Sequence, residues 1–181
     1  MLRGGMTTQQ LLPRPDEATA PTASSASPAF EALMKRLDEL QQLRYADPRQ
    51  ALALLAAELP AWPLPAHEGE RALLLARHAM QVGSAHLVLG EHALALPGFE
   101  RMLKHLDEPV LQAAPEPLRR GAQRCAAAGA NARAVLAHAM GDMAGALRGH
   151  LQALDLARAL ADRRYEAHVL VNLANTYEET G

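Results

Sequence analysis

Apolar side chains recur at three- and four-residue steps after residue 28, which is the spacing of one buried face of a helix. Asp47 and Pro48 then match a helix start, because an aspartate accepts from free backbone N–H groups and a first-turn proline needs no donor. The proline-rich stretch 60–65 ends this second helix. The apolar positions of the two helices are Phe30, Leu33, Leu37, Leu40 and Leu43, then Leu52, Leu55 and Leu59.

The same helix–turn–helix unit recurs further along the sequence. Helices are expected over 67–89, 92–105, from the prolines at 109–117 to 140, over 143–162 and over 164–181. The fourth helix has Leu94, Phe99 and Leu103 as its apolar positions. Turns at Ala46, Gly90, Gly141 and Gly181 are 44, 51 and 40 residues apart. The sequence therefore predicts an all-α fold of about seven helices that pair as antiparallel hairpins.

Residues 1–28 differ in composition from the rest of the sequence. They are rich in Thr, Ser, Ala and Pro, with prolines spaced so that no helix can form between them. Such a segment buries too little apolar surface to offset its ordering entropy. We predict a disordered tail over 1–28 and a helical array over 29–181.

Specific residues also recur in the repeated unit. Residues 79–86 contain Val82 and Gly83 and are followed by Gly90-Glu91-His92 and then by Ala95, Phe99 and Met102. The last unit has Leu173 and Ala174. This pattern resembles the tetratricopeptide repeat, in its longer version of about 40 residues. The resemblance implies a right-handed superhelical array, an α-solenoid whose concave surface binds protein or peptide ligands. It is similar to the arrays at the N-terminus of bacterial signalling proteins, such as GGDEF diguanylate cyclases, sensor kinases and transcription regulators.

The resemblance also implies candidate ligand-binding residues on the first helix of each unit. Asn172 and Asn175 match groove asparagines that hydrogen-bond a peptide backbone, since an amide both donates and accepts. Gln81 and Ser84 occupy the equivalent places in an earlier unit. In the unit between these two, the same places hold the apolar residues Ala132 and Val135. Arginines on the fifth predicted helix are candidates for binding a carboxylate, Arg124 and Arg133 among them, although a solvated face is the simpler explanation.

Composition adds little chemistry to this picture. The net charge of −2 gives no general reason to bind nucleic acid or an anionic membrane. No histidine pair has a metal-ligand spacing, and no cofactor or catalytic motif is present in the sequence. Cys125 is either a small buried residue or a thiol activated by nearby arginines, the former being expected. A lone cysteine and the lack of a signal-like segment indicate the cytoplasm.

The expected function is therefore that of a non-catalytic scaffold, the regulatory part of a larger protein. A free-standing adaptor that bridges two proteins is the alternative, and a small helical enzyme or metalloprotein is a more distant one. The sequence reaches Gly181 where a second helix of the last repeat is expected to begin, so we expect a cut within a repeat. Leu170, Leu173 and Tyr177 would then lie uncovered, and a homodimer through this face is possible.

Overall fold

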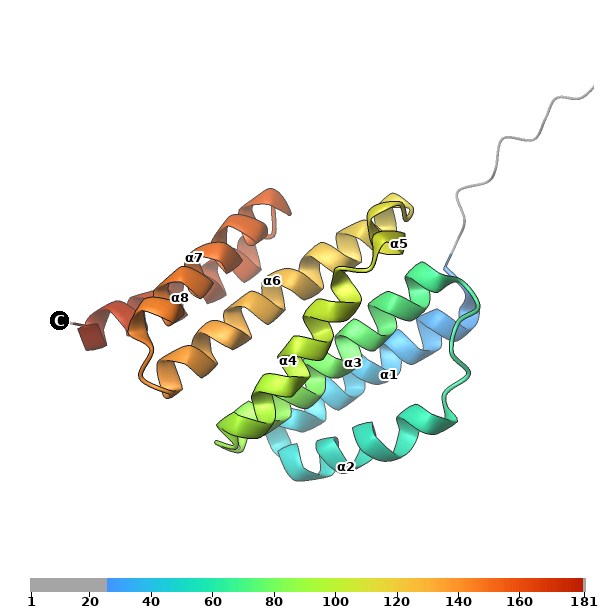
Figure 1. The fold of residues 1–181 in the computed structure, drawn as a ribbon, viewed down its shortest axis with the longest axis horizontal. Coiled ribbons are helices and arrows are strands. Elements are labelled where there is room, and N and C mark those ends of the chain that lie inside the picture. Colours follow the sequence, from blue (N-terminus) through green and yellow to red (C-terminus); the bar gives the residue numbers. More distant parts are fainter. Residues whose placement is uncertain (1–25, 181) are drawn as a thin grey trace, which may run out of the picture.

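The computed structural model describes residues 26–180, and every regular element within them is helical. Its eight α-helices are joined by short turns and one 3-10 turn (Figure 1). The helices are α1 (Pro28–Ala46), α2 (Pro48–Glu58), α3 (Glu68–Val88), α4 (His92–Leu106), α5 (Pro109–Gln112), α6 (Glu116–Ala139), α7 (Met143–Ala159) and α8 (Arg163–Thr180), with η1 (Leu59–Ala61) after α2. The all-α prediction is confirmed, and the short helix α5 within the proline-rich connection is the element it missed.

The tail predicted for 1–28 lies outside the described residues except at its end. Here Ser27 and Pro28 already form the start of α1, because the Ser27 side chain accepts a hydrogen bond from the backbone N–H of Phe30. Glu70 on α3 in turn accepts from both the backbone N–H and the hydroxyl of Ser27. The helical region therefore begins at its cap residue, Ser27, slightly before the boundary that was predicted after residue 28.

Local sequence determines most of the other helix ends. The Asp47 carboxylate accepts from the backbone N–H of Gln50 at 2.9 Å, which confirms the predicted cap of α2. Asp142 caps α7 in the same way. Gly90 and Gly141 adopt φ of 72° and 81°, a left-handed conformation that favours glycine, and so end α3 and α6.

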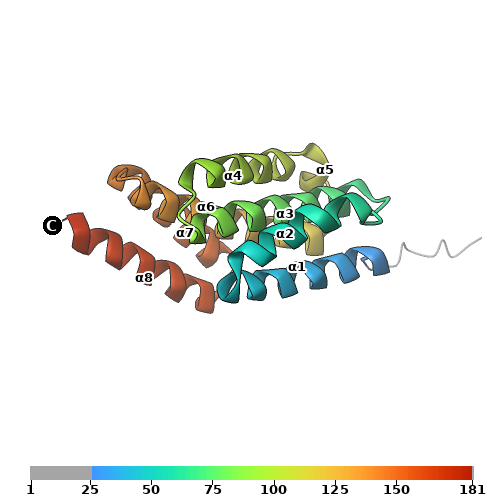
Figure 2. The same cartoon turned by 90° about the horizontal axis from the view of Figure 1, so that it is seen from below.

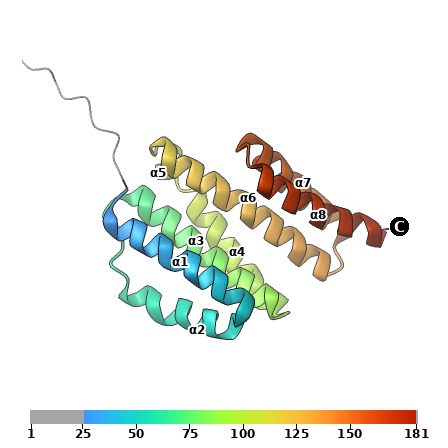
Figure 3. The ribbon, with the colours of Figure 1, turned by 180° about the vertical axis from the view of Figure 1, so that it is seen from behind.

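The helices pack as hairpins laid side by side. α1 packs against α2, α3 against α4, and α6 against α7, and each hairpin contacts the next. Figure 3 shows α1, α3, α6 and α8 following one another across the molecule. Figure 2 shows α1 and α8 on one side of α3 and α6, with α4 on the opposite side. The two end helices thus flank the face that α3 and α6 form between them.

Small residues let the two helices of each central hairpin pack closely against each other. A Cβ placed on Gly98 of α4 would lie 2.6 Å from the backbone of Gly83 on α3. A Cβ on Gly149 of α7 would lie 2.8 Å from the Cβ of Ala134 on α6. Both pairs recur at a shift of 51 residues, the spacing of the turns at Gly90 and Gly141. The two hairpins therefore pack through equivalent positions.

This packing corrects the predicted core of α4. Phe99 is fully buried as predicted, but Leu94 and Leu103 are 56% and 39% exposed. Ala95 and Met102, which the repeat pattern names together with Phe99, are the positions in the core, each 0% exposed. On α2, the predicted Leu55 is buried, whereas Leu52 and Leu59 are only half-buried and Ala51 is fully buried.

Candidate ligand-binding groove

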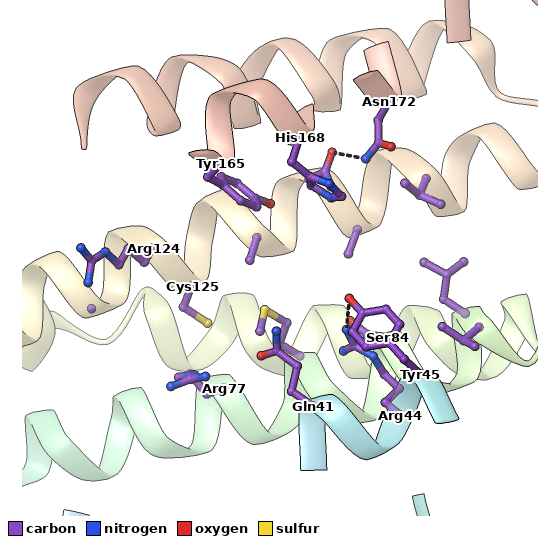
Figure 4. Close-up of a pocket in the computed structure, with 18 of the residues that line it drawn as sticks. Gln41, Arg44, Tyr45, Arg77, Ser84, Arg124, Cys125, Tyr165, His168 and Asn172 are labelled. Atoms are coloured by element: carbon purple, nitrogen blue, oxygen red, sulfur yellow. Dashed lines mark hydrogen bonds between the residues drawn. The ribbon is translucent and has the colours of Figure 1, made fainter. Parts of the chain in front are cut away.

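A groove of about 580 Å³ follows the face between α1 and α8. Side chains from α8 border one side and side chains from α1 the other, while α3 and α6 form the floor (Figure 4). Both polar and apolar side chains line it. The polar ones are Gln41, Arg44, Tyr45, Arg77, Ser84, Arg124, Asn131, Tyr165, His168 and Asn172, and the large apolar ones are Met34, Met80, Leu87, Val88 and Val135.

A buried polar network ties α1 to α3 at one side of the groove. The Arg44 guanidinium donates from Nη1 to Gln81 Oε1 at 2.6 Å and from Nη2 to the Tyr45 hydroxyl at 3.1 Å. Gln81 Nε2 donates to Gln41 Oε1 at 2.9 Å. Arg44 is 8% exposed, and its Nε is buried without a hydrogen-bond partner. This guanidinium is therefore incompletely satisfied by the protein itself.

A second polar network joins α6, α7 and α8. Asn131 Oδ1 accepts from Asn172 Nδ2 at 3.1 Å and lies 3.0 Å from His150 Nδ1. Because an amide oxygen only accepts, Nδ1 of His150 carries the hydrogen. Burial lowers the pKa of His150, so its ring is neutral and suited to this single donation. Asn131 thus fixes the orientation of Asn172 where α8 borders the groove.

The charged side chains that line the groove are cationic. Arg77 Nη2 pairs with Asp38 Oδ1 at 2.6 Å, and the Arg77 side chain is 19% exposed. Arg124 is exposed and forms no ion pair or side-chain hydrogen bond within residues 26–180. No carboxylate belongs to the described lining of the groove. The groove therefore presents positive charge although the protein as a whole has a net charge of −2.

The candidate residues divide between the groove and other places. Asn172 and Ser84 line the groove as predicted. Gln81 lies beneath its surface, 1% exposed, and its amide is occupied by Arg44 and Gln41, so it supports the groove without facing a ligand. Asn175 is not part of the described groove lining, but it lines a neighbouring cavity of about 220 Å³ near the end of α8. Asn172 lines this cavity as well as the groove, so the two asparagines predicted to act together do share one cavity.

The predicted arginine pair is also divided. Arg124 lines the groove, but Arg133 is exposed and is not part of the described groove lining. Nine residues correspond to two and a half helical turns, so the two side chains leave α6 on opposite sides. Arg119 pairs with Glu116, and Arg120 donates to the Leu160 carbonyl oxygen, so neither is free to face a ligand in the groove.

The small cavity near Asn175 contains a further polar cluster. His138 Nδ1 lies 3.1 Å from Thr176 Oγ1, and His138 Nε2 lies 2.9 Å from Glu179 Oε2. The Thr176 hydroxyl donates to the Asn172 carbonyl oxygen, as in a helix where a threonine bonds back one turn. These contacts tie the last turns of α8 to α6.

Two side chains of chemically reactive types, a cysteine and a histidine, have structural roles in this fold. Cys125 lies under the groove, and burial raises the pKa of its thiol to about 12 although the charge of Arg77 acts in the opposite direction. Burial lowers the pKa of His78, whose Nε2 donates to the Leu55 carbonyl oxygen at 2.9 Å. Among the described residues, no group of three or more His, Cys, Asp or Glu side chains could hold a metal ion. The expectation that Cys125 is a small buried residue is confirmed.

The polar groove residues that sequence reasoning missed are Gln41, Arg44, Tyr45, Arg77, Asn131, Tyr165 and His168. Arg44 belongs to a helix for which no motif was recognised, and Asn131 lies one residue before the position predicted from the repeat. The Tyr165 hydroxyl donates to the Ala127 carbonyl oxygen, and burial raises its pKa. Asn131 is a polar residue in an alanine-rich stretch of the sequence, and this was the one local signal that could have identified a groove residue.

The exposed face of α8 differs in part from the prediction. Leu173 is buried at 8% exposure and packs with Ala130, Ala153 and Leu154. Leu170 and Tyr177 are 42% and 53% exposed, as expected. Leu173 is covered because it points toward α6 and α7, so the prediction that all three would lie open is wrong for this residue.

Within the part of the protein that the structure describes, no helix has the length and apolar character needed to cross a membrane. Comparison of the sequence with protein-family models and with curated proteins, and of the fold with solved structures, found no match.

Proposed function

We propose that this protein is a non-catalytic, cytoplasmic scaffold that binds an extended segment of a protein partner in the groove between α1 and α8. The groove volume of about 580 Å³ carries the proposal. It lies within the range of roughly 300–1,000 Å³ typical of ligand-binding pockets. Apolar side chains such as Met80 and Val135 line it together with polar ones such as Ser84 and Asn172. An extended peptide can contact both kinds of side chain, through its own apolar side chains and its backbone amides.

The helix arrangement supports a repeat array of the tetratricopeptide kind. Equivalent close contacts recur in the α3–α4 and α6–α7 hairpins, and the second helix of each hairpin also packs on the first helix of the next. A right-handed superhelix built from such units has a concave surface made of first helices. The groove lies on that set of helices, α1, α3, α6 and α8. In a bacterial signalling protein, partner binding there would change the curvature of the array and so regulate an output domain.

The test blocks the groove without disturbing the opposite face. Ala132 and exposed His168 line the groove, so Ala132→Trp and His168→Trp fill it from α6 and from α8. Ala144→Trp on α7, also exposed but outside the described lining, is the matched control. Peptides selected from a degenerate 12-residue pool by the full-length protein should bind both groove variants at least about ten-fold more weakly in fluorescence anisotropy. Equal binding by the control and both groove variants contradicts the proposal.

A further inference from the structure

Arg44 is a buried cation that has no opposite charge within residues 26–180. None of the ion pairs in this part of the protein includes it, and its described partners are the neutral side chains of Gln81 and Tyr45. The Arg44 guanidinium carbon also lies 4.9 Å from the centre of the Tyr45 ring, and the residue occupies the last turn of α1, where carbonyl oxygens attract a cation. Dipoles and a ring offset only part of the cost of burying a full charge.

Two further arginines add to the positive charge of the same groove. Arg77 comes from α3 and Arg124 from α6, the two helices that form the floor of the groove (Figure 4). Arg77 is paired with Asp38, a carboxylate that is 62% exposed and lies outside the described groove lining. Arg124 has no acidic partner among the described residues. The three guanidinium groups therefore come from three different helices that share one groove.

We infer that the partner segment held in this groove is acidic, with carboxylates bound by Arg44, Arg77 and Arg124. This inference rests on the proposed function, because it specifies the chemistry of the same ligand. A guanidinium binds a carboxylate through two parallel hydrogen bonds, and the interaction is strong where water is excluded. A bound carboxylate gives Arg44 the opposite charge that the protein does not provide. The Met80 and Val135 side chains would contact apolar residues of the same segment.

A protein segment fits the groove better than a nucleic acid. Three cations are few for a phosphate backbone, whose binding depends on neutralising many phosphates at once. Large apolar side chains, among them Met34, Met80 and Leu87, also occupy much of the lining and match a peptide better than a sugar–phosphate backbone. The carboxylates can come from Asp and Glu side chains or from the C-terminus of the partner.

The experiment compares the binding of three pools of degenerate 12-residue peptides to the full-length protein. The pools share their apolar positions and differ only in their variable positions, which are Asp/Glu, Asn/Gln or Lys/Arg. Each pool is made with a free and with an amidated C-terminus, and a 12-nucleotide oligo-thymidine serves as a nucleic-acid probe. We expect the acidic pool to bind at least about ten-fold more tightly than the neutral pool at low salt and to weaken as salt is raised. Loss of that binding on amidation assigns the carboxylate to the C-terminus, and its persistence assigns it to side chains.

Matched variants on α6 separate the groove charge from general surface charge. Arg124→Gln is expected to weaken binding of the acidic pool by about three- to ten-fold, as for an exposed ion pair, and so to reduce the difference in affinity between the acidic and the neutral pool. Arg133→Gln removes an exposed arginine of the same helix outside the groove and should leave both unchanged. Arg44→Gln should have the larger effect, and Arg124→Gln keeps the test valid if Arg44→Gln fails to fold.

The outcomes distinguish the inference from the proposed function. Equal or weaker binding of the acidic pool, relative to the neutral pool, together with no loss of binding on amidation, overturns the inference while a groove that binds peptide remains. Oligo-thymidine bound more tightly than any peptide pool, and lost in Arg124→Gln, also overturns it. The proposed function itself is wrong if filling the groove has no effect, that is, if every peptide pool binds the Ala132→Trp variant as tightly as it binds the unchanged protein.

Discussion

Replacing Gly98 with alanine is expected to destabilise the fold although alanine is the better helix former. In a helix interior the change from Gly to Ala normally contributes about 1 kcal/mol of stability. Here the added Cβ would lie 2.6 Å from the Cα and N atoms of Gly83, against about 3.4 Å for ordinary contact. Both are backbone atoms, so no side-chain rotation relieves the overlap and α4 must move away from α3. Overpacking of this kind costs about 1–3 kcal/mol.

The cost of overpacking at Gly98 therefore exceeds the helix-propensity gain. Because the overlap is with backbone atoms, we take the upper part of that range, about 2–3 kcal/mol, and expect Gly98→Ala to lower the free energy of unfolding by about 1–2 kcal/mol net of the propensity gain. The melting temperature should fall by about 2–8 °C for a protein of this size. Urea denaturation followed by circular dichroism measures the change, and the slope should stay constant. Gly69→Ala in the first turn of α3 is the control, because its new Cβ would meet the ends of the His67 and Leu118 side chains at 3.1 Å or more. If Gly98→Ala is as stable as the unchanged protein, α3 and α4 do not approach as described.

Three further predictions concern single groups. Asp47→Ala should lower the free energy of unfolding by about 1 kcal/mol through loss of the α2 cap, measured by urea denaturation. Cys125 should react with iodoacetamide at pH 8 only after unfolding, since burial raises its pKa to about 12, and fast labelling of the folded protein would contradict this. Burial lowers the pKa of His78 and His150 below 6.5, so the unfolded state binds more protons below that pH and stability should fall from pH 7.5 to 5.5. His78→Gln should reduce that slope, whereas a slope that His78→Gln leaves unchanged would refute the assignment.

Helix positions could be predicted from the sequence because their causes are local. Asp47 caps α2 and Asp142 caps α7 through groups three residues ahead, and Gly90 and Gly141 supply the left-handed turns. Each signal lies within a few residues of the boundary it determines. The recurrence of these signals also predicted the hairpin pairing, because two helices joined by a short turn pack as antiparallel neighbours.

Helix register was harder to predict in a sequence so rich in Ala and Leu. Several faces of such a helix are apolar, so periodicity alone does not decide which of them is buried. On α4 the contact is selected by how closely the backbones approach, which buries Ala95, Gly98 and Met102 and leaves Leu94 in solvent. Large leucines are excluded from the closest contact because there is no room for their side chains.

The candidate site was predictable in position but not in its interactions. The repeat pattern indicated the helix positions of Ser84 and Asn172, which do line the groove. Their neighbours come from residues distant in the sequence, as Asn131 lies 41 residues from Asn172 and Arg44 lies 37 from Gln81. Such pairs depend on the rotation of each helix about its axis, which a single sequence does not specify. Arg133 was misplaced for the same reason.

The two polar networks also determine how rigid the groove is before a ligand arrives. Gln81 holds Arg44 on the α1 side, and Asn131 holds Asn172 on the α8 side. Side chains fixed in this way lose little conformational freedom on binding, so more of the interaction energy remains as affinity. The networks lie at opposite borders of the groove, and between them α3 and α6 contribute apolar side chains such as Met80 and Ala128 to one core. In the array that we propose, a ligand that spans the groove would be held at both borders, so a change in their separation on binding would alter the curvature of the array.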